Sequence, residues 1–72
     1  MNDDRLLDLH GIRHDDVDRV VENFVLLNKA PLTIICGNSD KMIKLVRETL
    51  DRIYDNHDIG WHMSNHNTYK IL

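Results

Sequence analysis

The sequence predicts a two-layer α/β sandwich in which two helices cover one face of a four-stranded mixed sheet. Three observations lead to this fold class. The chain has 72 residues, which suits a single domain over residues 1–72. Two segments repeat apolar residues at helical spacing, and four short segments have the alternation or the β-branched composition of strands. Their order along the chain is β-α-β-α-β-β, so the first three strands should run the same way and the last antiparallel.

The first predicted strand covers residues 5–10, where apolar and polar residues alternate. Leu7 and Leu9 fall on one face, which we expect to pack against the helices. Asp8 and His10 then fall on the outward face, at the carboxyl end of the strand. Gly11 ends the strand, and the carboxyl edge of an open α/β sheet is where ligands usually bind.

A first helix is predicted over about residues 14–27, because Val17, Val20, Val21 and Phe24 recur at helical spacing. Its start is poorly capped, since Arg13 stands where Ser, Thr, Asp or Asn is preferred. A turn with Pro31 follows, and the apolar segment Leu32–Cys36 has the composition of a buried strand.

A loop, Gly37–Asp40, breaks this second strand, and Asn38 or Ser39 can cap the helix that follows. The second helix is predicted over about residues 41–55, from the spacing of Ile43, Val46, Leu50 and Ile53. Two strands, Ile59–Met63 and Thr68–Leu72, complete the chain.

Two helices are too few to cover both faces of this sheet, so we expect both on one face. The predicted core consists of Leu7, Leu9, Val17, Val21, Phe24, Ile34, Val46, Leu50 and Ile53. Trp61 and Tyr69 are expected to pack in the core or at its edge, and Cys36 to be a small core residue.

Composition narrows the function classes. Charged residues make up 29% of the chain and the formal net charge is −3, which argues against a strongly basic nucleic-acid binder but leaves room for a local basic patch. Cys36 is the single cysteine, and the first residues show no basic leader with an apolar core, so the expected compartment is the cytoplasm. The longest apolar run falls short of the roughly 20 residues that span a bilayer, so no membrane partner is expected.

Asp8 and His10 are the candidate catalytic residues, because side chains two residues apart on a strand converge on one substrate. Histidine titrates near neutral pH and transfers protons, and a neighbouring carboxylate can orient its ring. The alternative interpretation is structural: Asp8 caps backbone amides while His10 packs on the turn.

Two further groups are candidate nucleic-acid contacts. The strand-to-helix loop of Gly37, Asn38 and Ser39 offers free N–H groups to a phosphate, although most such loops are ordinary capped turns. His62 and Lys70 are expected on the open face, where they contact a phosphate backbone or form a solvated surface. The remaining histidines, His14, His57 and His66, match no metal cluster and are expected at the surface.

The segment "LDLHG", Leu7–Gly11, with an acidic helix start, an apolar strand and a glycine loop after it, resembles the small MutS-related (Smr) domain. The similarity extends over nearly the whole chain and includes the order of elements. The family's Gly-x-Gly loop is matched at Gly37, whereas Ser39 replaces its second glycine. The turn before the last strand is Asn65–Asn67, where the family often has glycines.

This resemblance implies a stand-alone Smr domain that binds DNA or RNA and has endonuclease activity, with Asp8 and His10 at the catalytic positions and Gly11 permitting their geometry. A divalent metal requirement stays open. The alternative is a catalytically silent adaptor that binds a protein partner, or a second copy of itself, through the open sheet face or the first helix. The acidic charge and Ser39 favour the adaptor, and the intact LDLHG motif favours the nuclease.

Overall fold

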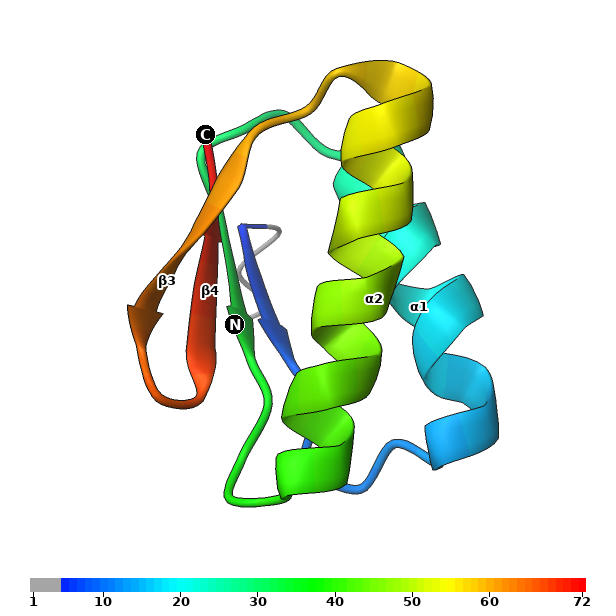
Figure 1. Cartoon of the computed structure of the whole chain (residues 1–72), viewed down its shortest axis with the longest axis vertical. Helices are drawn as coiled ribbons and strands as arrows, with labels where there is room; N and C mark the ends of the chain where they lie inside the picture. Colours follow the sequence, from blue (N-terminus) through cyan, green and yellow to red (C-terminus); the bar gives the residue numbers. More distant parts are fainter. Residues whose placement is uncertain (1–4) are drawn as a thin grey trace.

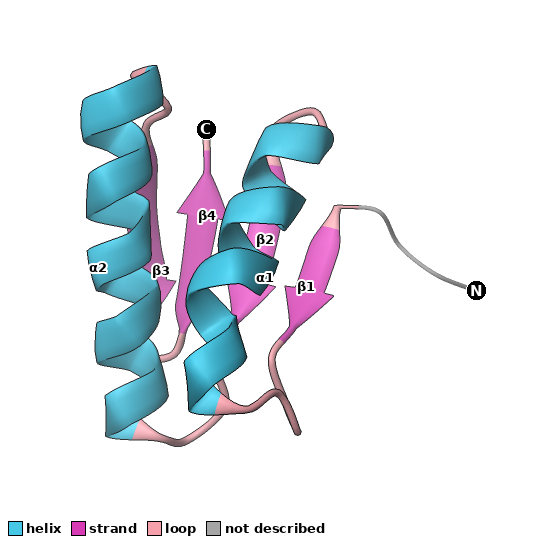
Figure 2. Cartoon of the chain, turned by 90° about the vertical axis from the view of Figure 1, so that its right-hand side faces the viewer, coloured by secondary structure: helices cyan, strands magenta, loops and turns pink. Residues whose placement is uncertain are grey.

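The protein forms two layers, one of helices and one of strands. The structure, a computed structural model, describes residues 5–72. The helices α1 (His14–Leu27) and α2 (Asp40–His57) lie side by side on one face of the sheet, and the other face is not covered by any described helix (Figures 1 and 2). The predicted fold class, element order and placement of both helices are therefore confirmed.

The sheet has the strand order β1-β2-β4-β3. Its strands are β1 (Leu6–Asp8), β2 (Leu32–Ile35), β3 (Trp61–Asn65) and β4 (Thr68–Ile71). β1 and β2 pair in parallel, whereas β4 is antiparallel to both β2 and β3. The crossover from β2 through α2 to β3 therefore leaves a space one strand wide, which β4 fills as the hairpin partner of β3. The predicted strand directions hold, but only one pair of neighbours is parallel.

The two helices differ in how they begin. Arg13 provides no side-chain cap for α1, as expected, although Asp15 and Asp16 place negative charge in its first turn. Ser39 caps α2, because its Oγ accepts a hydrogen bond from the Met42 N–H at 3.2 Å. α2 is longer than predicted, and the residue that caps its C-terminus, Asp58, adopts a left-handed conformation with φ of 55°.

The core fills the space between the helices and the sheet. Seven of the nine predicted core residues are buried there: Leu9, Val17, Val21, Ile34, Val46, Leu50 and Ile53. Leu7 and Phe24 are only partly buried, so their predicted burial is wrong. Leu7 belongs to the edge strand β1, and the helix turn that holds Phe24 presents Val25 to the core instead.

Tyr69 and Trp61 both belong to the helix-facing side of the sheet. Tyr69 is completely buried, and its hydroxyl donates a hydrogen bond to the Ile43 carbonyl of α2 at 3.1 Å. The rings of Trp61 and Tyr69 meet edge to face, with centroids 5.4 Å apart. Cys36 is buried as expected, and burial raises the pKa of its thiol to about 11. Tyr69 is thus a core residue, as expected.

Candidate nucleic-acid interface

Three loops meet at one edge of the sheet. The strands β1, β2 and β3 all end at this edge, which is the lower edge in Figure 1, and both helices begin there. The Leu9 N–H donates to the Ile35 carbonyl at 2.9 Å, and the Cys36 N–H donates to the Asn67 carbonyl at 2.8 Å. Backbone hydrogen bonds therefore hold the β1–α1 loop, the β2–α2 loop and the β3–β4 turn in one row.

The β1–α1 loop begins with a tight turn. The Ile12 N–H donates to the Leu9 carbonyl at 3.0 Å, and Gly11 has a φ of 83°, a conformation that a side chain disfavours. Asp8 stabilises this turn, because its Oδ1 accepts a hydrogen bond from the His10 N–H at 2.9 Å. Asp8 and His10 are both exposed to solvent, and neither points into the helix layer.

This arrangement changes the role expected of Asp8. We expected its carboxylate to orient the imidazole of His10, whereas the hydrogen bond that it makes is to the backbone of that residue. Asp8 therefore fixes the turn that carries His10. The structural interpretation of Asp8 as a cap of the turn is thus correct.

The β2–α2 loop lies directly beside this turn. Gly37 has a φ of 76°, and Asn38 and Ser39 are exposed. Ser39 uses its hydroxyl to cap the Met42 N–H, so this donor is already satisfied within the chain. Asp40 in the first turn of α2 adds negative charge next to it. An anion at this loop would have to bind the remaining backbone N–H groups beside Gly37 and Asn38.

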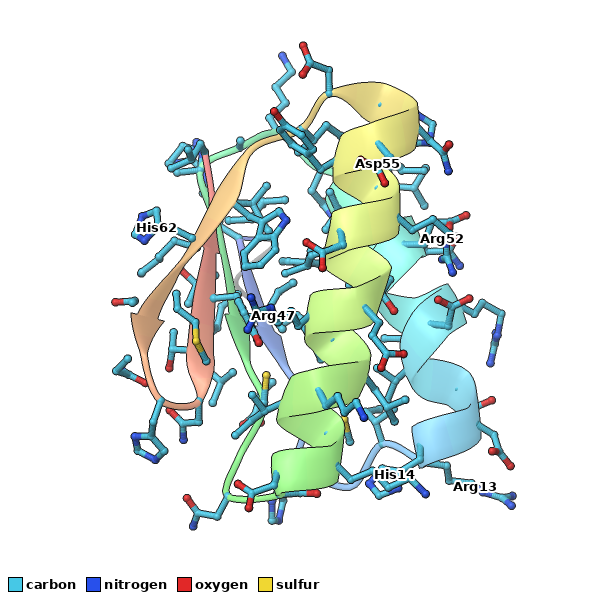
Figure 3. The ribbon with its side chains drawn as sticks, viewed as in Figure 1. Arg13, His14, Arg47, Arg52, Asp55 and His62 are labelled. Carbon is cyan, nitrogen blue, oxygen red and sulfur yellow. The ribbon has the colours of Figure 1, made fainter. Side chains whose placement is uncertain are left out.

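Lys70 and His62 lie on the open face of the sheet, as predicted. The backbone register aligns Thr33, Lys70 and His62 in one row across β2, β4 and β3. The Lys70 Nζ donates to the Thr33 Oγ1 at 2.8 Å, and His62 points away from the helices in Figure 3. Asp8 pairs with Ile35, which follows Thr33 by two residues on β2. Asp8 therefore lies on the same face of the sheet, about 7 Å along the strands from the row that contains Thr33 and Lys70.

The structure also adds the β3–β4 turn to this edge. Asn65 closes the turn, because its Oδ1 accepts a hydrogen bond from the Asn67 N–H at 3.1 Å. His66, at the tip, is exposed. Sequence reasoning recognised the turn but not its neighbours, because its position beside β2 follows from the insertion of β4 into the sheet. The available sequence signal was the alternation of polar and apolar residues over Thr68–Ile71, which shows that one face of this strand is buried but does not show which strand lies beside it.

A separate polar cluster joins the two helices. A cavity of about 310 Å³ lies between them, lined by His14, Asp18, Leu45, Glu48, Thr49 and Arg52. Arg52 pairs with Asp18 at 2.6 Å and with Glu22 at 2.8 Å, and the buried Thr49 hydroxyl donates to Asp18 at 3.0 Å. The hydrogen bond from Arg52 holds the pKa of Asp18 below its usual value. These ion pairs and this hydrogen bond connect Asp18 and Glu22 of α1 to Thr49 and Arg52 of α2, so the cluster holds the two helices together.

The described residues contain neither a cluster of metal ligands nor a membrane-spanning helix. Over residues 5–72, no three His, Cys, Asp or Glu side chains are grouped so that they can hold a metal ion. Within the same residues, neither helix has the length and apolar character needed to cross a bilayer. Comparison of the chain with protein-family models, with curated proteins and with solved structures found no match. The functional hypothesis therefore depends on the site residues themselves.

Proposed function

We propose that this protein binds nucleic acid along the edge formed by Asp8–Gly11 and Gly37–Ser39 and cleaves a phosphodiester bond there, as the Smr domains that it resembles do. The observation that carries the proposal is the exposure of Asp8 and His10 at the end of β1, directly beside the β2–α2 loop. An exposed imidazole on a turn fixed by a carboxylate and a glycine is suited to proton transfer at a bound phosphate.

In this mechanism His10 is the catalytic residue. Its imidazole takes a proton from the attacking oxygen, or gives one to the leaving oxygen, as the phosphorus–oxygen bond to the leaving group breaks. For hydrolysis, water adds across that bond, and one product keeps the phosphate while the other gains a hydroxyl. Asp8 acts as a positioning residue through the His10 backbone.

Substrate binding depends on contacts to phosphates. Gly11, Gly37 and Asn38 bring backbone groups to the edge, while Lys70 and His62 supply positive or titratable groups on the adjoining face. Because Lys70 is already held by Thr33, its ammonium is oriented before the ligand arrives. The net charge of −3 opposes such binding, so the affinity depends on these local phosphate contacts, each of which adds to the salt dependence.

The test is a cleavage assay on supercoiled plasmid DNA and on structured RNA, each with and without a divalent metal. His10→Ala should lower the cleavage rate by about a hundredfold or more, the usual scale for a general acid or base. His57→Ala is the matched control, because His57 is an exposed histidine in the last turn of α2, at the opposite end of the molecule. Equal rates for the two variants would contradict the assignment of His10.

Two substitutions of Asp8 separate its charge from its hydrogen bond. Asp8→Asn keeps an oxygen that accepts from the His10 N–H, whereas Asp8→Ala removes it. If Asp8 only positions the turn, the Asn variant should retain most of the cleavage rate and the Ala variant should lose it. An Asn variant as inactive as the Ala variant would show that the carboxylate charge is required. Activity that survives the double change Asp8→Ala and His10→Ala would belong to a contaminant.

Lys70→Gln tests binding apart from chemistry. It should weaken affinity and reduce the salt dependence by about one phosphate contact, with little effect on the rate of the bound complex. Lys29→Gln is its control, because Lys29 is exposed in the turn before β2, at the other edge of the sheet. Equal affinities for the two variants would remove Lys70 from the interface.

A second candidate function is a catalytically silent interaction module. The observation in its favour is that Asp8 and Ser39 both have complete structural roles, as caps of a turn and of a helix. Wild-type protein that is folded, binds nucleic acid or a partner protein, and cleaves neither substrate in the assay above would support this candidate and refute the nuclease.

A further inference from the structure

The strand β3 forms an exposed edge of the sheet on the side where α2 also lies. It pairs with β4 alone, so the backbone groups of its outer side have no strand partner within the described sheet. On its helix-facing side Trp61 is partly buried and Met63 is 42% exposed. Met63 is the more exposed of the two because β3 diverges from α2 toward the carboxyl end of β3 (Figure 1).

The flank of α2 beside β3 carries opposite charges one turn apart. Arg47 points from α2 toward the sheet in Figure 3, and Asp51 follows it by four residues. Residues four positions apart are neighbours on a helix surface, so the exposed Asp51 lies beside Arg47 on α2. Neither residue takes part in an ion pair among residues 5–72.

We propose that this surface, the β3–α2 flank, binds a second copy of the chain. A two-fold axis beside β3 pairs the two β3 strands antiparallel and brings the two α2 helices side by side in opposite directions. Arg47 of each chain then faces Asp51 of the other, because charges one turn apart on one helix become complementary under a two-fold rotation. The same contact covers the exposed parts of Trp61 and Met63.

The charge pattern favours a second copy over other occupants. A nucleic acid presents a uniformly negative backbone, which Asp51 and the exposed Asp55 on the next turn would repel. A bulge between Met63 and Asn65 limits the regular edge of β3 to Trp61–Met63, so strand pairing is short. The helix contact must therefore contribute much of the affinity. Asp8 lies on β1 at the opposite edge of the sheet, so the dimer leaves the proposed catalytic residues uncovered, whereas His62 lies on the paired strand β3 itself.

The test is sedimentation equilibrium as a function of concentration, with Trp61 fluorescence as a second measurement. The 8.5 kDa chain should form a species of twice its mass, and emission from the single tryptophan should shift to shorter wavelength as the dimer forms. Arg47→Glu or Asp51→Arg alone should weaken dimerisation by about tenfold or more, because each replaces two attractions with two repulsions. The double variant should restore it.

Lys29→Glu is the matched control, because it makes the same charge change as Arg47→Glu at an exposed position in the turn between α1 and β2, outside the β3–α2 flank. Far-ultraviolet circular dichroism checks that every variant is folded. The proposal is overturned if the wild type stays monomeric to millimolar concentration, or if the double variant dimerises no better than the single ones. It is also overturned if an oligonucleotide, added to monomeric protein, produces the Trp61 shift that dimerisation should give.

Discussion

The hydrogen bond from Tyr69 to α2 gives the sharpest stability prediction. The ring of Tyr69 is completely buried in the central strand β4, and its hydroxyl is 3.1 Å from the Ile43 carbonyl. Tyr69→Phe removes this bond between the two layers and keeps the ring and its edge-to-face contact with Trp61. The Ile43 carbonyl lies inside α2 and keeps its helical partner, so it is not left without a hydrogen bond.

The expected cost is therefore that of one neutral hydrogen bond, about 1 kcal/mol in the free energy of unfolding. A domain of this size gains about 0.15 kcal/mol/K of entropy on unfolding, from roughly 2.1 cal/mol/K per residue. The melting temperature should then fall by about 7 °C. Thermal unfolding followed by circular dichroism at pH 7 measures this shift, and urea unfolding measures the free energy independently.

Tyr54→Phe is the matched control, because Tyr54 is 51% exposed on the same helix that Tyr69 contacts. The same atom is removed, but from a site where water replaces the lost contact. We expect the control to melt within about 3 °C of the wild type, since exposed substitutions usually change stability by less than about 0.5 kcal/mol. If Tyr69→Phe and Tyr54→Phe melt at the same temperature, the bond to Ile43 does not stabilise the fold.

Four further predictions follow from single residues. Asp58→Gly should raise the free energy of unfolding by about 0.5–1 kcal/mol in urea unfolding, because Asp58 has a left-handed φ of 55° that glycine adopts without strain. Phe24→Ala should cost about 1–3 kcal/mol in the same measurement, less than a fully buried aromatic, because Phe24 is only partly buried. Burial raises the pKa of the Cys36 thiol from 9.0 to about 11. The thiol therefore loses its proton at a lower pH in the unfolded chain than in the folded protein, so the free energy of unfolding falls as pH rises from 9.0 to about 11. Between pH 8 and 10.5 the wild type should lose roughly 2 kcal/mol more than Cys36→Ala. The hydrogen bond from Arg52 lowers the pKa of Asp18, so the ionised Asp18 stabilises the folded protein above the ordinary carboxylate pKa, and this stabilisation is lost as pH falls. Arg52→Gln should therefore raise the pKa of Asp18 in a carbon-13 NMR titration.

The sequence by itself determined the helices and the direction of each strand. α1 covers the predicted residues 14–27, because its apolar spacing repeats over four turns and allows one buried face. The short segment at Leu32–Ile35 was recognised as a buried strand from its β-branched composition. These signals are local, since each residue is compared only with neighbours a few positions away. The exposed positions of Asp8 and His10 followed from the same local alternation.

Only the tertiary structure decided which strands are neighbours. A strand's pattern shows that one face is buried but not which strand pairs with it, so the insertion of β4 between β2 and β3 was not predicted. That insertion buries Tyr69 and brings the Asn65–Asn67 turn to the candidate site. The structure likewise decided that Asp8 bonds to the His10 backbone rather than to its ring. The strand order and the hydrogen bond of Asp8 both depend on contacts that form when the whole chain packs together. The spacing of residues within one segment gives no information about such contacts.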